Sequence, residues 1–483
     1  MNIKKAFPFK IKAEWVVLAL VTGVLFYSHL YWDIIITTRH GINVWYSLFD
    51  GRIFDFYFDN VNPPVSNFAT SSAIYPFTVY VVFAVWNFPL WLAERFFGFD
   101  PFMSTAALMY GKSILIPFLL GCGFMVYKIC TKLEMGKTNS KWCAYFFLSS
   151  ALVFFSLAVT GQYDIFSLFF ILLGLYFYLE KKYIGFIIFF GIAITLKMFA
   201  LFIFIPLVLL YEKRIYVIAA NLIGGITFYF FLSAAFVIPD GSTAIMNRMI
   251  GYLFSSTLPL TYVHTPIFVI LTILLWIFCY IAVPLENEAE RGEIAVYAAF
   301  LSMAVLFVAC YTHLYWIILM SPFMSILCFI CLKNKRHTRA VFLIETMASG
   351  AVVFALNILG TPVFSMYTIN SAVLPTLFGE VQGEINLAQI LAERLGENGS
   401  TFLGFIPASC TAAFVAGIIA LSVICYRKNG NKKTPAADGF ERTENIESKL
   451  IEPPKDIIWG RLALNSFICG VPVLCYFYLL LSQ

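Results

Sequence analysis

The sequence has little charge: only 12% of its 483 residues are Asp, Glu, Lys or Arg, whereas 61% are hydrophobic. Soluble domains have about a quarter of their residues charged. A core of this size cannot hide so much apolar surface from water, so lipid is expected to cover the remainder. The net charge of +5 is small, and no basic patch suggests a nucleic-acid partner. The composition therefore indicates an integral membrane protein.

The 11 cysteines also lack a functional pattern, because their spacing matches neither a metal site nor a disulfide framework. Most lie inside apolar runs, and we interpret them as small buried hydrophobic residues. Residues 1–14 carry lysines before an apolar run, but no small-residue cleavage site follows. This segment is therefore predicted to start membrane insertion without being cleaved.

The apolar runs predict an all-α, polytopic protein with about 13 spanning helices, since a span needs about 20 apolar residues, or fewer when it packs among others. The candidate spans are residues 15–31, 103–127, 142–160, 165–180, 184–196, 198–211, 215–238, 264–284, 294–311, 313–332, 340–359, 402–426 and 460–481. A further run, 73–97, is interrupted by Pro76 and Pro89. Length alone does not decide whether this run crosses the membrane.

The distribution of the 32 Lys and Arg residues decides between the two topologies, because basic residues concentrate in cytoplasmic segments. If 73–97 is an interfacial or re-entrant helix, the segments that hold most of the basic residues share the cytoplasmic side. These segments are 1–14, 128–141, 181–182, 212–214, 285–293, 333–339 and 427–461. If 73–97 spanned instead, 1–14 and 128–141 would lie on opposite sides. We therefore predict a cytoplasmic N-terminus in the cell membrane.

The large outer loops are then 32–102, 239–263 and 360–401, and interfacial helices are expected in the first. In the last, apolar residues recur at helical spacing over 385–395, which predicts a helix lying flat on the outer interface. Residues 427–459 are polar and contain three prolines, so they are predicted to form a flexible cytoplasmic linker.

An acidic residue, Asp33, lies at the outer end of the first predicted span. A carboxylate at the rim of a bilayer loses some hydration, which raises its basicity and suits it to accept a proton from a hydroxyl. Asp33 is thus a candidate general base, and a solvated acid at a helix end is the alternative. Asp50, Asp55 and Asp59 of the same loop are interpreted as solvated acids.

A polar turn and an isolated lysine also fall on the predicted outer side. Gln162 and Asp164 lie between two apolar runs, either as ligands for sugar hydroxyls or as an ordinary turn. Lys197 interrupts the run 183–211, whose two flanks are both basic. That run must go out and return in legs of roughly 20 Å. A lysine at such a depth is costly, and a phosphate or carboxylate is its natural partner, although it could also extend to the interface.

Other cationic side chains on the predicted outer side are Lys112, Arg248, His264 and His313. Each could bind an anionic lipid head group or stay at the interface. Together with Asp33 they predict an outer cavity with one base and several cations, which suits a lipid-phosphate substrate.

These residues, in this order, resemble the GT-C superfamily of integral-membrane glycosyltransferases. The chain is most similar to the glucosyltransferases of N-glycan assembly that use dolichyl-phosphate-glucose, and to their bacterial relatives. Asp33, Arg39, His40 and Trp45 match that family's acid, Arg-His and Trp, with one extra residue before the Arg. Residues 75–78 (Tyr-Pro-Phe-Thr) partly match its Tyr-Pro-Pro-Leu-Thr segment and lack the second Pro.

Three later segments complete the resemblance, which covers residues 1 to about 330. Residues 161–164 (Gly-Gln-Tyr-Asp) are similar to the family's His-Phe-Gln-Tyr-Asn loop, with Asp in place of Asn. Lys197 matches a lysine inside a broken hairpin of the family. His313 matches the His of the family's His-Glu-Lys motif, and Leu314 and Tyr315 depart from it. The resemblance implies a catalytic transmembrane module over 1–330 and a variable transmembrane region over 331–483.

The resemblance also implies a reaction, namely inverting transfer of a sugar from a polyprenyl-phosphate carrier to a lipid-linked or cell-surface glycan acceptor. Asp33 would be the base, and membrane lipid would surround the site. The residues implied in substrate binding are Arg39, His40, Tyr75, Gln162, Asp164, Lys197, Arg248 and His313. No cofactor is expected, since a divalent metal occurs only in some relatives and no acidic pair here demands one.

Two other functions stay open from the sequence. A flippase or exporter of lipid-linked sugars would place charges midway through several spans and would have internal symmetry. A surface-polysaccharide polymerase would need outer loops rich in Arg and His. The polar residues here gather on one predicted face, which favours the one-sided enzyme.

Overall fold

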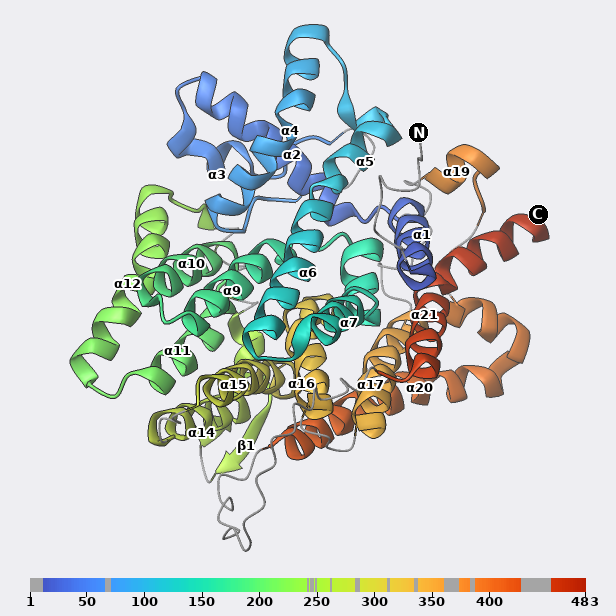
Figure 1. Cartoon of the computed structure of the whole chain (residues 1–483). Coiled ribbons are helices and arrows are strands. Elements are labelled where there is room, and N and C mark those ends of the chain that lie inside the picture. Colours follow the sequence, from blue (N-terminus) through green and yellow to red (C-terminus); the bar gives the residue numbers. More distant parts are fainter. Residues whose placement is uncertain are drawn as a thin grey trace, which may run out of the picture.

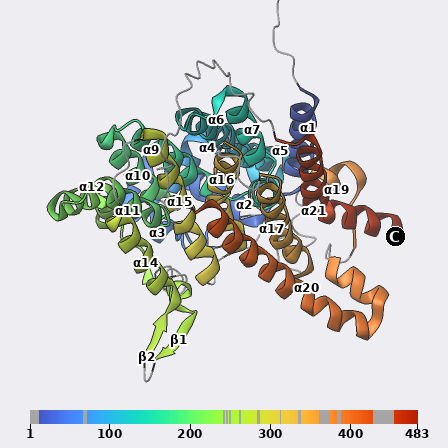
Figure 2. The ribbon, with the colours of Figure 1, turned by 60° about the horizontal axis from the view of Figure 1, so that its bottom comes forward.

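The structure is a computed structural model, and it describes residues 12–65, 71–240, 243, 247, 250–260, 263–282, 287–310, 313–333, 338–359, 373–382, 387–426 and 453–483. The described residues are almost entirely helical, which confirms the predicted all-α fold (Figure 1). The strands among them form a two-stranded antiparallel hairpin, which projects from the bundle in Figure 2 and in which Leu258 pairs with Thr265.

In chain order the elements are α1 (Ala13–Ser28), α2 (Trp32–Phe49), η2 (Ile53–Asp55), α3 (Phe56–Asp59), α4 (Phe77–Phe97), η3 (Pro101–Met103), α5 (Thr105–Ser113), α6 (Leu115–Lys132), α7 (Gly136–Leu148), α8 (Ala151–Val153), the π-helix η4 (Phe154–Val159), α9 (Asp164–Leu179), α10 (Tyr183–Leu196), α11 (Ala200–Tyr211), α12 (Ile215–Ala235), η5 (Tyr252–Phe254), β1 (Thr257–Leu260), β2 (Val263–Pro266), α14 (Ile267–Ile281), α15 (Glu288–Ala309), η6 (Leu314–Leu319), α16 (Ser321–Lys333), α17 (Thr338–Leu359), α19 (Val373–Phe378), α20 (Leu387–Cys425) and α21 (Lys455–Ser482).

Seven helices among the described residues are long and apolar enough to cross a membrane, or up to nine if each of two bent pairs is one span. These helices indicate a membrane protein. The bent pairs are α1 with α2, at 77°, and α7 with residues 151–159, at 45°. Five more apolar helices are shorter, so the number of about 13 spans stays a prediction.

The hairpin predicted around Lys197 is confirmed as two short helices. α10 has 14 residues and α11 has 12, and the backbone between them is extended at Lys197, with φ −154°. At ~1.5 Å per residue each leg is only about 20 Å long. The residues at the break therefore lie at the tip of a short hairpin, beside the beginning of α9.

The predicted loop 32–102 is mostly helical and forms a compact cap, in which α2 packs along α4 (Figure 1). The packing is close at Gly41, where an added Cβ would lie 2.6 Å from the Cβ of Phe83. A small separate core of Phe56, Tyr57 and Tyr80 joins this cap to Phe236 after α12. Because α4 is also long and apolar enough to span, its interfacial position stays a prediction.

Ion pairs connect several of the basic segments that were predicted to share one face. Lys132 at the end of α6 pairs with Glu180 after α9 at 3.1 Å. Lys333 at the end of α16 pairs with Glu293 of α15 at 3.1 Å and donates to the Leu133 carbonyl at 2.8 Å. These segments therefore meet at one end of the bundle, opposite the tip of the α10–α11 hairpin.

The C-terminal helices correct part of the predicted linker. Residues 427–452 lie outside the described residues, but α21 already begins at Lys455, so 455–459 are helical. Arg461, assigned with the cytoplasmic basic residues, is 1% exposed inside the bundle, where it pairs with Glu345 of α17 and donates to the Phe146 carbonyl at 3.0 Å. The predicted helix over 385–395 begins by Leu387 and ends at a kink at Gly396, with φ 67°.

Candidate active site

A polar cavity of about 300 Å³ lies beside the first turn of α2. Its walls come from α2, from the segment before α4, from the turn before α9 and from the residues around η6. The wall residues that carry the argument below are Asp33, His40, Tyr75, Tyr163, His313 and Trp316. The structure thus brings four predicted site residues together from segments distant in sequence.

A second cavity, of about 270 Å³, borders the polar one. The two cavities share Ile74, Tyr75 and Trp316 as wall residues. Apolar side chains make up nearly all of its remaining wall, and Lys197 is the one charged residue in the part of that wall that the structure describes. The polar cavity and the apolar cavity therefore form one amphipathic site, with Lys197 close to their common wall.

Asp33 follows the 77° bend between α1 and α2, beyond the predicted end of the first span. Its side chain is partly buried in the wall of the polar cavity. Burial raises the pKa of the Asp33 carboxyl to about 6, against the opposing effects of the Gln162 amide and the Lys197 ammonium. A carboxyl with this pKa is ionised at neutral pH and is more basic than a solvated one.

Lys112 of α5 holds the bend in place and is not available to a ligand, which corrects its assignment as a possible head-group contact. Its side chain is fully buried, and its Nζ donates to the carbonyls of Phe26, His29 and Ala158 at 2.6 Å each. These carbonyls belong to the ends of α1 and η4, where helix dipoles favour a cation. Lys112 therefore joins the segment before Asp33 to the segment before residues 161–164.

The turn before α9 is held by the conformation of Gly161, whose φ of +61° is left-handed. A Cβ at Gly161 would lie 3.4 Å from the Cβ of Ile34, so the turn packs directly against α2. Gln162 and Asp164 are 1% and 3% exposed and line neither cavity. They contact wall residues instead, since Gln162 lies beside Asp33 and Asp164 pairs with Lys197.

Lys197 lies against one carboxylate and three aromatic rings. Its Nζ lies 2.9 Å from Oδ1 of Asp164. It also lies 4.2 Å from the ring centroid of Trp316, 5.5 Å from that of Tyr75 and 5.4 Å from that of Phe199. Aromatic faces attract a cation, so this cage fixes the ammonium at the common wall of the two cavities.

The two residues of the Arg-His pair have different positions. Arg39 lines neither cavity, because its guanidinium pairs with Glu94 of α4 at 2.8 Å and lies 4.3 Å from the Phe102 ring. The ion pair of Arg39 therefore connects α2 to α4. His40 lines the polar cavity with its Nε2 3.1 Å from the Ser71 carbonyl, and burial lowers the pKa of its ring to about 3. His40 is therefore a neutral wall residue.

His313 lines the polar cavity and its ring stacks on Tyr315 at 5.1 Å. His264 lies on β2 and lines neither cavity, and Arg248 lies outside the described residues. Of the aromatic wall residues, Tyr75 was predicted and Tyr163 lies in the matched segment 161–164, whereas Trp316 was missed because Tyr, Phe and Trp are frequent throughout the chain.

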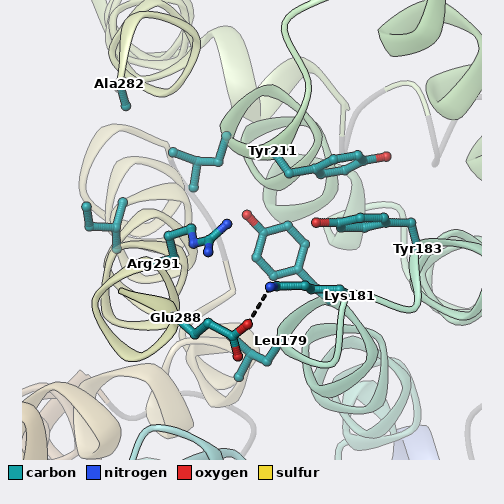
Figure 3. A pocket seen from close by; sticks show the side chains of 11 residues that line it. Leu179, Lys181, Tyr183, Tyr211, Ala282, Glu288 and Arg291 are labelled. Atoms are coloured by element: carbon teal, nitrogen blue, oxygen red, sulfur yellow. Dashed lines mark hydrogen bonds and ion pairs between the residues drawn. The ribbon is translucent and has the colours of Figure 1, made fainter. Parts of the chain in front are cut away.

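A further cavity, of about 100 Å³, lies at the other end of α9, between that helix, α11 and α15 (Figure 3). Lys181 pairs there with Glu288, and Arg291 lies across the cavity from Tyr183 (Figure 3). α9 has 16 residues, so about 24 Å separates this cavity from Asp164. None of the predicted site residues lines it.

No group of three or more His, Cys, Asp or Glu side chains that could hold a metal ion occurs among the described residues. No model of a known protein family matches the chain, and no curated protein matches its sequence.

Proposed function

We propose that the protein is an integral-membrane glycosyltransferase of the GT-C type, which moves a sugar from a polyprenyl-phosphate carrier to a lipid-linked or cell-surface glycan acceptor. The observation that carries this proposal is the shared wall between a polar cavity holding Asp33 and an apolar cavity holding Lys197. A lipid-phosphate sugar is itself polar at one end and apolar at the other, with one negative charge between them.

The three parts of such a donor match the three parts of the site. Its first isoprene units fit the apolar cavity, where burial of each CH₂ contributes about 0.8 kcal/mol. Its phosphate comes to the common wall, where Lys197 offers the charge. Its sugar occupies the polar cavity, whose wall combines aromatic rings with the carboxyl of Asp33.

The proposed reaction is a single displacement at the anomeric carbon. Asp33 accepts the proton of the acceptor hydroxyl, and the hydroxyl oxygen forms the new bond on the face opposite the phosphate. The bond between the anomeric carbon and the phosphate oxygen breaks, and the phosphate leaves with the electron pair. Lys197 stabilises the charge that develops on that oxygen. General-base assistance of this kind is worth about 10²–10⁴ in rate.

The proposal includes the predicted topology of about 13 spans, with the N-terminus cytoplasmic and both cavities on the extracytoplasmic side. The helix α4 and the helix from Leu387 to the kink at Gly396 would then lie at the outer interface. In support, the ion pairs of Lys132 and Lys333 lie at the end of the bundle opposite the cavities.

The experiment that tests this proposal uses the purified full chain, short-chain polyprenyl phosphates bearing single radiolabelled sugars, and a panel of lipid-linked oligosaccharide acceptors. The expected result is transfer of label to one acceptor class, with release of an equal amount of polyprenyl phosphate. The same donors are then tested with the protein in sealed vesicles. Movement of intact donor between leaflets, without transfer to any acceptor, would contradict the proposal and indicate a flippase.

A further inference from the structure

Asp164 already occupies the position of an anionic ligand on Lys197. We propose that Asp164 is a positioning residue that competes with the lipid phosphate for Lys197, and that it weakens binding of the product, polyprenyl phosphate, more than binding of the donor. This inference rests on the proposed function, since it concerns which of two lipid phosphates the same site retains.

The geometry shows that Lys197 already has an anionic partner within the chain. Its ammonium contacts Asp164 Oδ1 at 2.9 Å and is surrounded by the rings of Trp316, Phe199 and Tyr75. The side chains of Lys197 and Asp164 are 10% and 2% exposed, so water screens their attraction little. A phosphate that approaches Lys197 must therefore share it with a carboxylate that does not leave.

The second oxygen of Asp164 strengthens this competition. Asp164 Oδ2 is buried and has no hydrogen-bond partner among the described residues. A buried carboxylate with a partner on one oxygen only retains much of its negative field. That field repels any second anion that binds to Lys197.

The donor and the product differ in the charge that this field acts on. The donor is a phosphodiester with one negative charge, whereas the product is a monoester with about 1.5 to 2 negative charges at pH 7. A lone lysine would hold the product more tightly than the donor and would slow turnover. Repulsion by Asp164 grows with ligand charge, so it opposes the product about twice as strongly.

The other charged groups around the site do not replace Asp164 in this role. Asp33 of α2 also faces the polar cavity, but the proposed reaction leaves it protonated when the product forms. His313, before η6, faces the same cavity and offers no negative charge. Among the described residues, Asp164 is the acid that pairs with Lys197, at 2.9 Å.

The test compares wild type, Asp164→Asn and Asp164→Glu, using a short-chain polyprenyl phosphate and its methyl phosphodiester as binding probes. We measure their dissociation constants by calorimetry in detergent, together with KM for the donor and Ki for polyprenyl phosphate. An additional half to one unit of like charge at about 6 Å contributes at least about tenfold in affinity at an effective dielectric of about 20. Asp164→Asn is therefore expected to favour the monoester over the diester by about tenfold more than wild type does.

Asp164→Glu keeps the charge and is expected to retain the wild-type ratio, and Asp55→Asn, an exposed acid of the first outer loop, is the matched control. Equal tightening of both probes in Asp164→Asn, or no change, would overturn the inference. If Asp164→Asn fails to fold, wild type alone decides: nearly equal affinities support the inference, and a monoester preference above tenfold overturns it. Failure of both probes to bind to wild type would instead contradict the proposed function.

Discussion

Asp33 is the residue on which the proposed reaction depends, and its surroundings explain its raised pKa. The carboxyl is partly buried beside tyrosines, Lys197 offsets part of the desolvation and Asp164 opposes that effect. Because desolvation is the largest of these effects, the pKa of Asp33 rises to about 6. The carboxylate can therefore act as a base at neutral pH without being strongly hydrated.

The first prediction concerns the pH dependence of kcat/KM. A base must be deprotonated to act, so kcat/KM for wild type is expected to rise with pH and to reach half its maximum near pH 6. The measurement is a pH–rate profile between pH 4.5 and 8 with saturating acceptor. A profile that is flat across this range, or that falls as pH rises through 6, would contradict the role of Asp33.

Sequence reasoning found Asp33 and Lys197 because an ionisable residue in or next to an apolar run is costly and needs an explanation. It included Tyr163 only within the matched segment 161–164 and missed Trp316, because one aromatic residue among 26 tyrosines and 9 tryptophans is uninformative without a motif. It misassigned Lys112, whose partners are backbone carbonyls. Backbone carbonyls are present at every residue, so the amino-acid sequence does not indicate which of them a lysine will contact.

At the scale of elements, two breaks in helices create the site. The chain turns between α1 and α2, and it turns again between η4 and α9. Lys112 joins both breaks, because its three acceptors end the helices that precede Asp33 and Gln162. The buried ammonium of Lys112 thus holds the end of α1 close to the end of η4, and the proposed reaction requires the residues that follow these two ends to lie together.

The second prediction follows from this arrangement. Lys112→Met removes three charge-assisted hydrogen bonds and leaves buried carbonyls unsatisfied, so it is expected to reduce the free energy of unfolding by about 3 kcal/mol. It should also reduce kcat/KM, because Asp33 loses its position. Thermal unfolding in detergent and initial rates measure the two effects. Lys128→Met on the neighbouring α6 is the control, and equal behaviour of the two variants would refute the role given to Lys112.

The broken hairpin of α10 and α11 could be predicted, because a single apolar run with basic residues on both flanks cannot cross the membrane once. The bend between α7 and residues 151–159 could not. Its only local sign is the pair Ser149-Ser150, and its geometry depends on contacts such as that of Asn465 with the Ser149 carbonyl. Bends that depend on distant helices are set by packing rather than by local sequence.

At the scale of the whole molecule, the C-terminal region proves to be joined to the rest of the bundle. Arg461 and Glu345, both fully buried, connect α21 and α17 to the end of α7. The sequence analysis assigned Arg461 to the basic cytoplasmic segment 427–461, because basic residues near a span end usually face the cytosol. A buried ion pair between helices reverses that expectation, and only the partner's position in space reveals it.

The third prediction concerns the sidedness of the molecule. Cys410 and Cys425 are the partly exposed native cysteines, so both are first replaced by Ser to silence labelling. Asp55→Cys in the cap and Lys137→Cys on α7 then report on opposite faces through a membrane-impermeant maleimide. We expect Asp55→Cys to react from outside in intact cells, and Lys137→Cys only in inverted vesicles. Labelling of both positions from one side would refute the topology.

The most direct test of the account measures sugar transfer by Asp33→Asn, which keeps the size of the side chain and removes the base. The readout is the amount of extended acceptor formed per enzyme, determined by mass spectrometry, with Asp55→Asn as the matched variant. We predict that Asp33→Asn loses roughly 10²- to 10⁴-fold in rate while Asp55→Asn stays close to wild type. A rate for Asp33→Asn within twofold of wild type would contradict the central claim.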